Sequence, residues 1–102
     1  MHPILDRLPE YEIQQTFEDT FREVAALNDV GFFEVEVVRD PEVTLKLRIA
    51  SMVGKAGEVE FQQNPELQAI VVQFPEGPVT YRFVEAISVS GLEIEVLYRP
   101  EA

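Results

Sequence analysis

The hydrophobic residues of this chain follow a helical spacing in only one stretch, close to the N-terminus. After Pro9, apolar side chains recur every three or four residues as far as about Asn28, which places them on one face of an α-helix. These positions are Ile13, Phe17, Phe21, Val24 and Leu27. Gly31 is suited to follow the end of the helix, because glycine readily adopts positive φ. The spacing therefore predicts one amphipathic helix over about residues 10–28.

Beyond Gly31 the hydrophobic spacing changes to every second residue, which is typical of strands with one buried and one solvated face. The clearest example is Val43 to Ile49, where apolar and polar side chains alternate. Turn-forming residues separate such segments. The pattern predicts six strands, at 32–39, 42–51, 57–63, 68–74, 79–87 and 92–99. Because short connections favour pairing of consecutive strands, we expect a single α+β domain over residues 1–102, with one N-terminal helix packed on a twisted, antiparallel, six-stranded β-meander.

Loop lengths test this pairing, because opposed residues of antiparallel strands share a face. The first two strands both bury odd-numbered positions, which requires a connection with an odd number of residues, and residues 40–42 provide one. Glu36 is then expected to face Lys46, and Glu34 to face Arg48. The fourth strand buries even-numbered positions, and the loops on either side of it have the even lengths that this change requires.

The outer face of the predicted sheet changes in character toward the C-terminus. The first three strands present charged side chains to solvent, with Glu60 expected beside Arg48. The last three strands present apolar side chains between two arginines. These residues are expected in two neighbouring rows, Val71 with Arg82 and Arg99, and Ala69 with Val84 and Leu97. A contiguous apolar group bordered by charge is typical of an interaction surface, so we expect a second subunit or a partner protein to cover it.

Two arrangements would remove this apolar group from solvent without a partner. In the first, the sheet coils until it partly covers itself. In the second, residues 1–8 lie over the group through Ile4, Leu5 and Leu8. In either case the surface would belong to the fold and would not be a binding site.

The last predicted hairpin contains a conflict. With a tight turn at residues 90 and 91, the alternation that turns Phe83, Ile87 and Tyr98 inward also turns Glu85 inward. A carboxylate in an apolar layer keeps its proton more readily, which is how general acids arise. A cavity between helix and sheet would then be lined by Tyr81, Glu85 and Tyr98, with Tyr11 as a further candidate. The alternative is a β-bulge at this point of the strand, which would return the carboxylate to solvent.

Composition restricts the available chemistry. The chain contains no cysteine and a single histidine, His2, so neither disulfides, thiolate metal sites nor a Ser-His-Asp site is expected. The glycines never reach a phosphate-binding spacing. Two pairs of alternating carboxylates, Glu58 with Glu60 and Glu93 with Glu95, are typical of solvated strand faces and would bind a hard cation only weakly. We therefore expect no metal and no cofactor.

Charge restricts the partners. The chain has 19 acidic and 8 basic residues, a formal net charge of −11, and its basic residues are scattered singly. Such a chain repels phosphates, so we expect neither nucleic acid nor an anionic membrane as a partner. No apolar run approaches the roughly 20 residues that span a bilayer, and the first residues do not resemble a secretion signal. These features predict a cytoplasmic protein.

These observations favour a non-catalytic, acidic protein-binding or assembly module that acts through the outer face of the C-terminal half of its sheet. It would act as a homo-oligomer or with a protein partner. The alternative is a small-ligand-binding protein or enzyme that uses the cavity described above. A third possibility, an acidic mimic of nucleic acid, rests on net charge alone.

Overall fold

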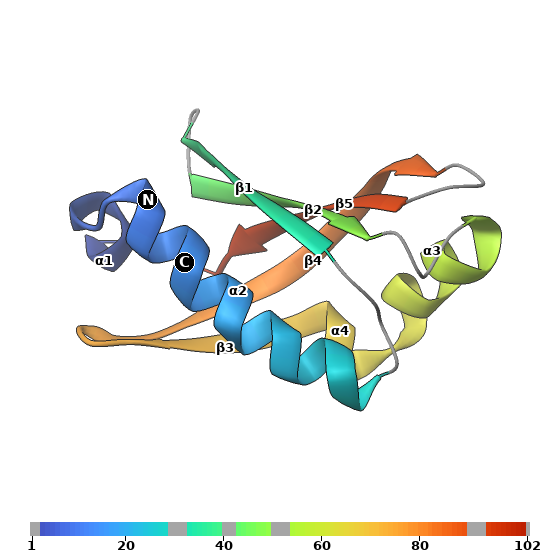
Figure 1. The fold of residues 1–102 in the computed structure, drawn as a ribbon, viewed down its shortest axis with the longest axis horizontal. Helices are drawn as coiled ribbons and strands as arrows, with labels where there is room; N and C mark the ends of the chain where they lie inside the picture. The colour runs from blue at the N-terminus through green and yellow to red at the C-terminus, as the bar shows by residue number, and fades with distance from the viewer. Residues whose placement is uncertain (1–2, 29–32, 40–42, 50–53, 90–93, 102) are drawn as a thin grey trace.

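The computed structural model describes residues 3–28, 33–39, 43–49, 54–89 and 94–101. Its elements, in chain order, are α1 (Pro3–Arg7), α2 (Glu10–Leu27), β1 (Phe33–Arg39), β2 (Val43–Ile49), α3 (Gly54–Gln63), α4 (Pro65–Gln68), β3 (Ala69–Phe74), β4 (Gly77–Val89) and β5 (Ile94–Pro100). The strands form one antiparallel sheet (Figure 1). The α+β class, the N-terminal helix and the antiparallel pairing are therefore as predicted.

The predicted helix is α2, which begins directly after Pro9. Its buried residues follow a strict step of four, at Ile13, Phe17, Phe21 and Ala25. The line of buried residues therefore passes through Ala25 at the C-terminal end of the helix, and the expected positions Val24 and Leu27 lie to one side of it. Val24 is only partly buried, and Leu27, expected in the core, is 82% exposed.

The prediction of a strand at 57–63 is wrong, because these residues belong to helix α3. The expectation rested on the alternation of only Val59 and Phe61, whereas the segment is otherwise rich in helix-forming Lys, Ala, Glu and Gln. Phe61 inserts into the core while Val59 is 43% exposed. Asn64 then begins the short helix α4 by accepting a 2.9 Å hydrogen bond from the Glu66 N–H. The sheet consequently has five strands within the described residues.

The strand order is β1-β2-β5-β4-β3, so the predicted sequential meander is also wrong. The helical segment α3–α4 replaces the expected third strand and carries the chain from β2 to the far edge of the sheet. Strands β3, β4 and β5 then return as a meander that ends beside β2. The strand pairs predicted from short loops do form: β1 pairs with β2 in one segment, and β4 pairs with both β3 and β5 in the other. The pairing of β2 with β5 joins the two segments.

The register predicted for the first hairpin is confirmed. Glu34 faces Arg48 and Glu36 faces Lys46, and the Arg48 Nη1 lies 3.1 Å from the Glu34 Oε2. Glu60 is not beside Arg48, because it lies in α3. Glu95 of β5 takes that position in the register instead.

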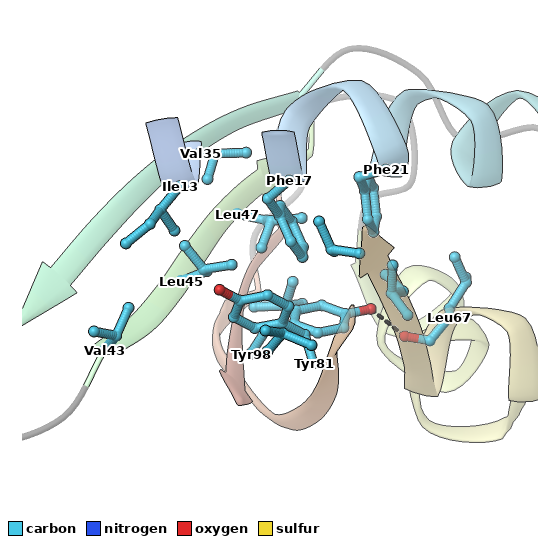
Figure 2. Packing of buried hydrophobic residues seen from close by; sticks show 14 of the residues in the cluster. Ile13, Phe17, Phe21, Val35, Val43, Leu45, Leu47, Leu67, Tyr81 and Tyr98 are labelled. Carbon is cyan, nitrogen blue, oxygen red and sulfur yellow. Dashed lines mark hydrogen bonds between the residues drawn. The ribbon is translucent and has the colours of Figure 1, made fainter. Parts of the chain in front are cut away.

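A single hydrophobic core lies on the face of the sheet toward α2, which we call the inner face. α2 contacts both edge strands, β1 and β3, so the twisted sheet curls around the helix (Figure 1). Phe17 is central to this contact: its ring centroid lies 5.1 Å from that of Tyr81 and 5.9 Å from that of Tyr98, both edge-on (Figure 2). Such aromatic pairs contribute about 0.5–1.5 kcal/mol each beyond the burial of their surface.

The two core tyrosines differ in how their hydroxyls are satisfied. The Tyr98 hydroxyl donates a hydrogen bond to the Leu67 carbonyl oxygen of α4 (Figure 2), whereas the Tyr81 hydroxyl is buried and has no partner among the described residues. An unpaired buried hydroxyl costs free energy, and a paired one contributes modestly to stability. The two hydroxyls therefore have opposite effects on stability: that of Tyr98 stabilises the fold, and that of Tyr81 destabilises it.

We expect Tyr98→Phe to lower the free energy of unfolding by about 1 kcal/mol, because it leaves the Leu67 carbonyl without its donor. Tyr81→Phe removes an unsatisfied hydroxyl and should leave stability unchanged or raise it by up to about 1 kcal/mol. Urea unfolding of the two variants measures both changes. A larger loss for Tyr81→Phe than for Tyr98→Phe would contradict this account of the core.

Candidate functional site: the outer face of the sheet

The described helices pack on the inner face and leave the opposite, outer face of the sheet open. Residues 3–8 do not cover it, because Leu5 and Leu8 are buried in the core. Of the predicted surface residues, Val71 is 50% exposed and Val84 39% exposed. Ala69 and Leu97 are half-buried, so the apolar group is shielded from solvent only in part.

All six predicted surface residues lie on the outer face, but in rows different from those expected. Arg82 does face Arg99, as predicted, yet Ala69 stands in that row where Val71 was expected. Val71 faces Thr80 in the next row. The arginines therefore separate Val71 from the apolar residues on the other side of the row, instead of bordering the apolar group. The reason is that the helical segment shifts which strands are neighbours.

Two register shifts in β4 determine the rest of this surface. They fall between Phe83 and Glu85 and between Ala86 and Ser88, where β4 has an extra residue relative to β5. The first shift confirms the bulge alternative: Phe83 faces Tyr98 on the inner side, while Glu85 faces Leu97 and is exposed. The second places Ile87 on the surface, 44% exposed, and so the expectation of an inward Ile87 is wrong.

The sequence pattern did not indicate two members of this surface. Ile87 extends the apolar group beyond Val84, and the only signal for it was the parity conflict at Glu85, since one bulge in a long strand permits another. Glu101 forms an ion pair with Arg82. The pattern contained no signal for this contact, which depends on where the chain leaves β5.

The residues of the alternative cavity do not come together. Tyr81 and Tyr98 are fully buried in the inner layer, Glu85 lies on the opposite face of the sheet, and Tyr11 is 75% exposed on α2. Burial raises the pKa of Tyr98 far above its usual value. Burial also raises the pKa of Tyr81, an effect that the Arg39 guanidinium partly offsets. Both hydroxyls are therefore neutral members of the core and are poorly placed for proton transfer.

A hollow of about 280 Å³ lies beside β1, where Gln14 and Glu18 of α2 approach the outward-facing side chains of the first strands. Seven of its eight lining residues are charged or polar, namely Gln14, Glu18, Glu34, Glu36, Lys46, Arg48 and Glu95, and the eighth is Val35. Ligand pockets are usually larger and mostly apolar. Because its charges face one another across strands, as Glu34 and Arg48 do, we interpret the hollow as a solvated ion-pair surface.

The described residues contain no group of three or more side chains suited to hold a metal ion. Glu58 and Glu60 do not alternate along a strand, since both belong to α3, and Glu93 lies outside the described residues. No helix within the described part of the chain is long and apolar enough to cross a membrane.

Comparisons with known proteins do not add a functional assignment. No protein-family model matches this chain, and neither does any curated protein or solved structure.

Because Tyr81 and Tyr98 are buried, we expect the free energy of unfolding to fall in alkali. Because burial raises their folded-state pKa above the usual value of about 10, the folded chain holds these protons more tightly than the unfolded chain. The resulting stability is complete below about pH 10. Above it, the free energy of unfolding should fall by up to about 1.4 kcal/mol per pH unit for each tyrosine. Urea unfolding across this range measures the slope, and a double variant Tyr81→Phe, Tyr98→Phe that retains the full slope would contradict its assignment.

Proposed function

We propose that this chain is a non-catalytic protein-binding module that docks a partner protein on the outer face of the C-terminal half of its sheet. The observation that carries the proposal is the exposure of Val71, Val84 and Ile87 on a sheet face without a covering helix among the described residues. Val84 and Ile87, with the half-buried Leu97, lie on one side of the arginine row and Val71 lies on the other. Exposed apolar side chains beside charges in this way are typical of interaction surfaces.

The charges of this face suggest the chemistry of the partner. Arg82 and Arg99 lie on the C-terminal half of this face, whereas Lys46 and Arg48 lie on β2, where they face Glu36 and Glu34. Arg82 and Arg99 stand directly opposite each other on neighbouring strands, an arrangement that costs stability unless carboxylates offset it. Glu101 forms an ion pair with Arg82.

A partner surface with apolar side chains around one or two carboxylates would complement this arrangement. The carboxylates would meet the arginine row, and the apolar side chains would cover Val71 on one side of it and Val84 with Leu97 on the other. Burial of the apolar side chains would supply most of the affinity, and the arginines would set the orientation and make association weaker at high salt.

The substitution Val84→Glu, alone and combined with Leu97→Glu, should weaken binding of an isolated partner by about 30-fold or more, as expected for central contacts of an interface. Leu27→Glu is the matched control, because Leu27 is also exposed and apolar but lies at the end of α2. Calorimetric titration of each purified variant with the purified partner measures the change, with thermal unfolding as the check that the fold is intact.

An anionic, apolar dye such as anilinonaphthalene sulfonate provides a test that needs no partner. Its ring matches the apolar group and its sulfonate matches the arginine row. We expect the folded wild-type chain to enhance the dye's fluorescence, the Leu27→Glu control to match it, and Val84→Glu with Leu97→Glu to lower it several-fold. Equal enhancement by all three proteins would remove the support for this surface as a binding site.

A further inference from the structure

The two edges of the sheet differ in how they are protected against pairing with another strand. The edge strands are β1 and β3. β1 carries Glu34, Glu36 and Arg39, whereas β3 has the sequence Ala-Ile-Val-Val-Gln-Phe, with no charge and no proline. Natural sheets block exposed edges with charges, prolines or bulges, or cover them with a helix or a loop. β3 has no charge, proline or bulge, and although α2 contacts β3, Val71 and Gln73 remain exposed.

The backbone of β3 has hydrogen-bonding groups directed away from the sheet. Gln73 faces Pro78, which has no N–H and so cannot belong to a hydrogen-bonded pair with it. The bonded pairs to β4 are therefore those of the alternate residues of β3, namely Ile70, Val72 and Phe74. The 2.8 Å bond from the Glu101 N–H to the Thr80 carbonyl agrees, because it shows Thr80 directed toward β5 and not toward β3.

The N–H and C=O groups of Ala69, Val71 and Gln73 consequently point to the open edge. β4 is the only strand that pairs with β3 among the described residues. Val71 and Gln73 are also exposed. Strand addition requires such a row of free backbone groups.

We propose that β3 pairs antiparallel with β3 of a second copy of this chain, about a two-fold axis at Val71, and so joins two sheets edge to edge. This inference goes beyond the proposed function, because it concerns the backbone groups of the sheet edge and shares only the Val71 side chain with the docking surface. Two outer faces would then form one continuous surface.

The sequence of β3 is self-complementary in this register. Val71 faces Val71 of the second copy, and Ile70 faces Val72 of the second copy, so both layers are extended by apolar pairs. Ala69 faces Gln73 of the second copy, and no charge opposes a like charge. Few segments of a strongly acidic chain can pair with themselves without placing two carboxylates opposite each other. The same operation centred on Val35 or Glu36 of β1 would place Glu34 against Glu36 of the second copy, or Glu36 against itself.

The substitution Gln73→Pro tests the edge with little effect on the outer surface. It removes an N–H that β4 does not use, it keeps Val71, and edge positions tolerate proline. Val71→Lys is a second test, because it places two ammonium groups opposite each other at the axis. Analytical ultracentrifugation should show a dimer for the wild type, and each substitution should raise the dissociation constant at least about tenfold.

Val84→Glu is the matched control, since it alters the outer face away from the edge and should leave the dimer intact. If Val84→Glu abolishes the dimer while Gln73→Pro does not, the second copy docks on the outer face and the edge proposal is wrong. A dimer that survives both edge substitutions is equally contrary to the proposal, and so is a wild type that stays monomeric at the highest soluble concentration.

Amide hydrogen exchange tests edge pairing in the wild-type chain, without any substitution. The Val71 and Gln73 amides should be protected in the wild type, and protection should increase with protein concentration. Fast exchange of both amides at every concentration would overturn edge pairing. It would leave the proposed docking surface untouched, because partner binding is measured separately through Val84 and Leu97.

Discussion

The contact of Phe17 with Tyr81 and Tyr98 joins the two layers of this protein. It brings α2 onto the inner face of the sheet, with Phe21 stacked beside Phe17 at 5.8 Å. Tyr98 extends the contact further, because its hydroxyl binds the Leu67 carbonyl and so fixes α4 to the same layer. All of the large aromatic side chains that are fully buried belong to this layer.

This concentration of apolar groups on one face leaves the other face without a cover. A chain of 102 residues has one core, and here the described helices all contribute to it. Apolar side chains on the outer face are therefore left exposed by the described helices. The first two strands of this face present charges paired across strands, whereas the C-terminal half retains exposed valine and isoleucine.

The same one-sided packing makes the sheet edges important. A sheet that curls around one helix does not close on itself, so two edge strands remain, β1 and β3. β1 carries charged side chains, whereas β3 carries none. The docking surface and the β3 edge meet at Val71, whose side chain lies on the outer face and whose backbone lies on the edge. A partner on the outer face and a second copy on the edge would both contact the Val71 side chain, whereas only the second copy would use its backbone groups.

The sequence by itself determined the local features of this protein. The spacing of three or four residues from Ile13 to Leu27 was enough to predict a helix, and the alternation with odd and even loop lengths was enough to pair Glu34 with Arg48. These features depend on neighbours in the chain, and helix and strand periodicities express them directly. The parity conflict at Glu85 likewise marked the bulge.

Only the tertiary structure decided which strands became neighbours and which residues shared a row. Val59 and Phe61 were too few to distinguish a strand from a helix, and the outcome depended on Phe61 reaching the core beside Phe83. Because that segment forms α3 and not a strand, β5 pairs with β2, and the arginine row lies between the apolar residues instead of bordering them. Long-range pairing is set by the closure of the whole core, which no local spacing records, and the two arginines were therefore correctly paired with each other but wrongly placed among their neighbours.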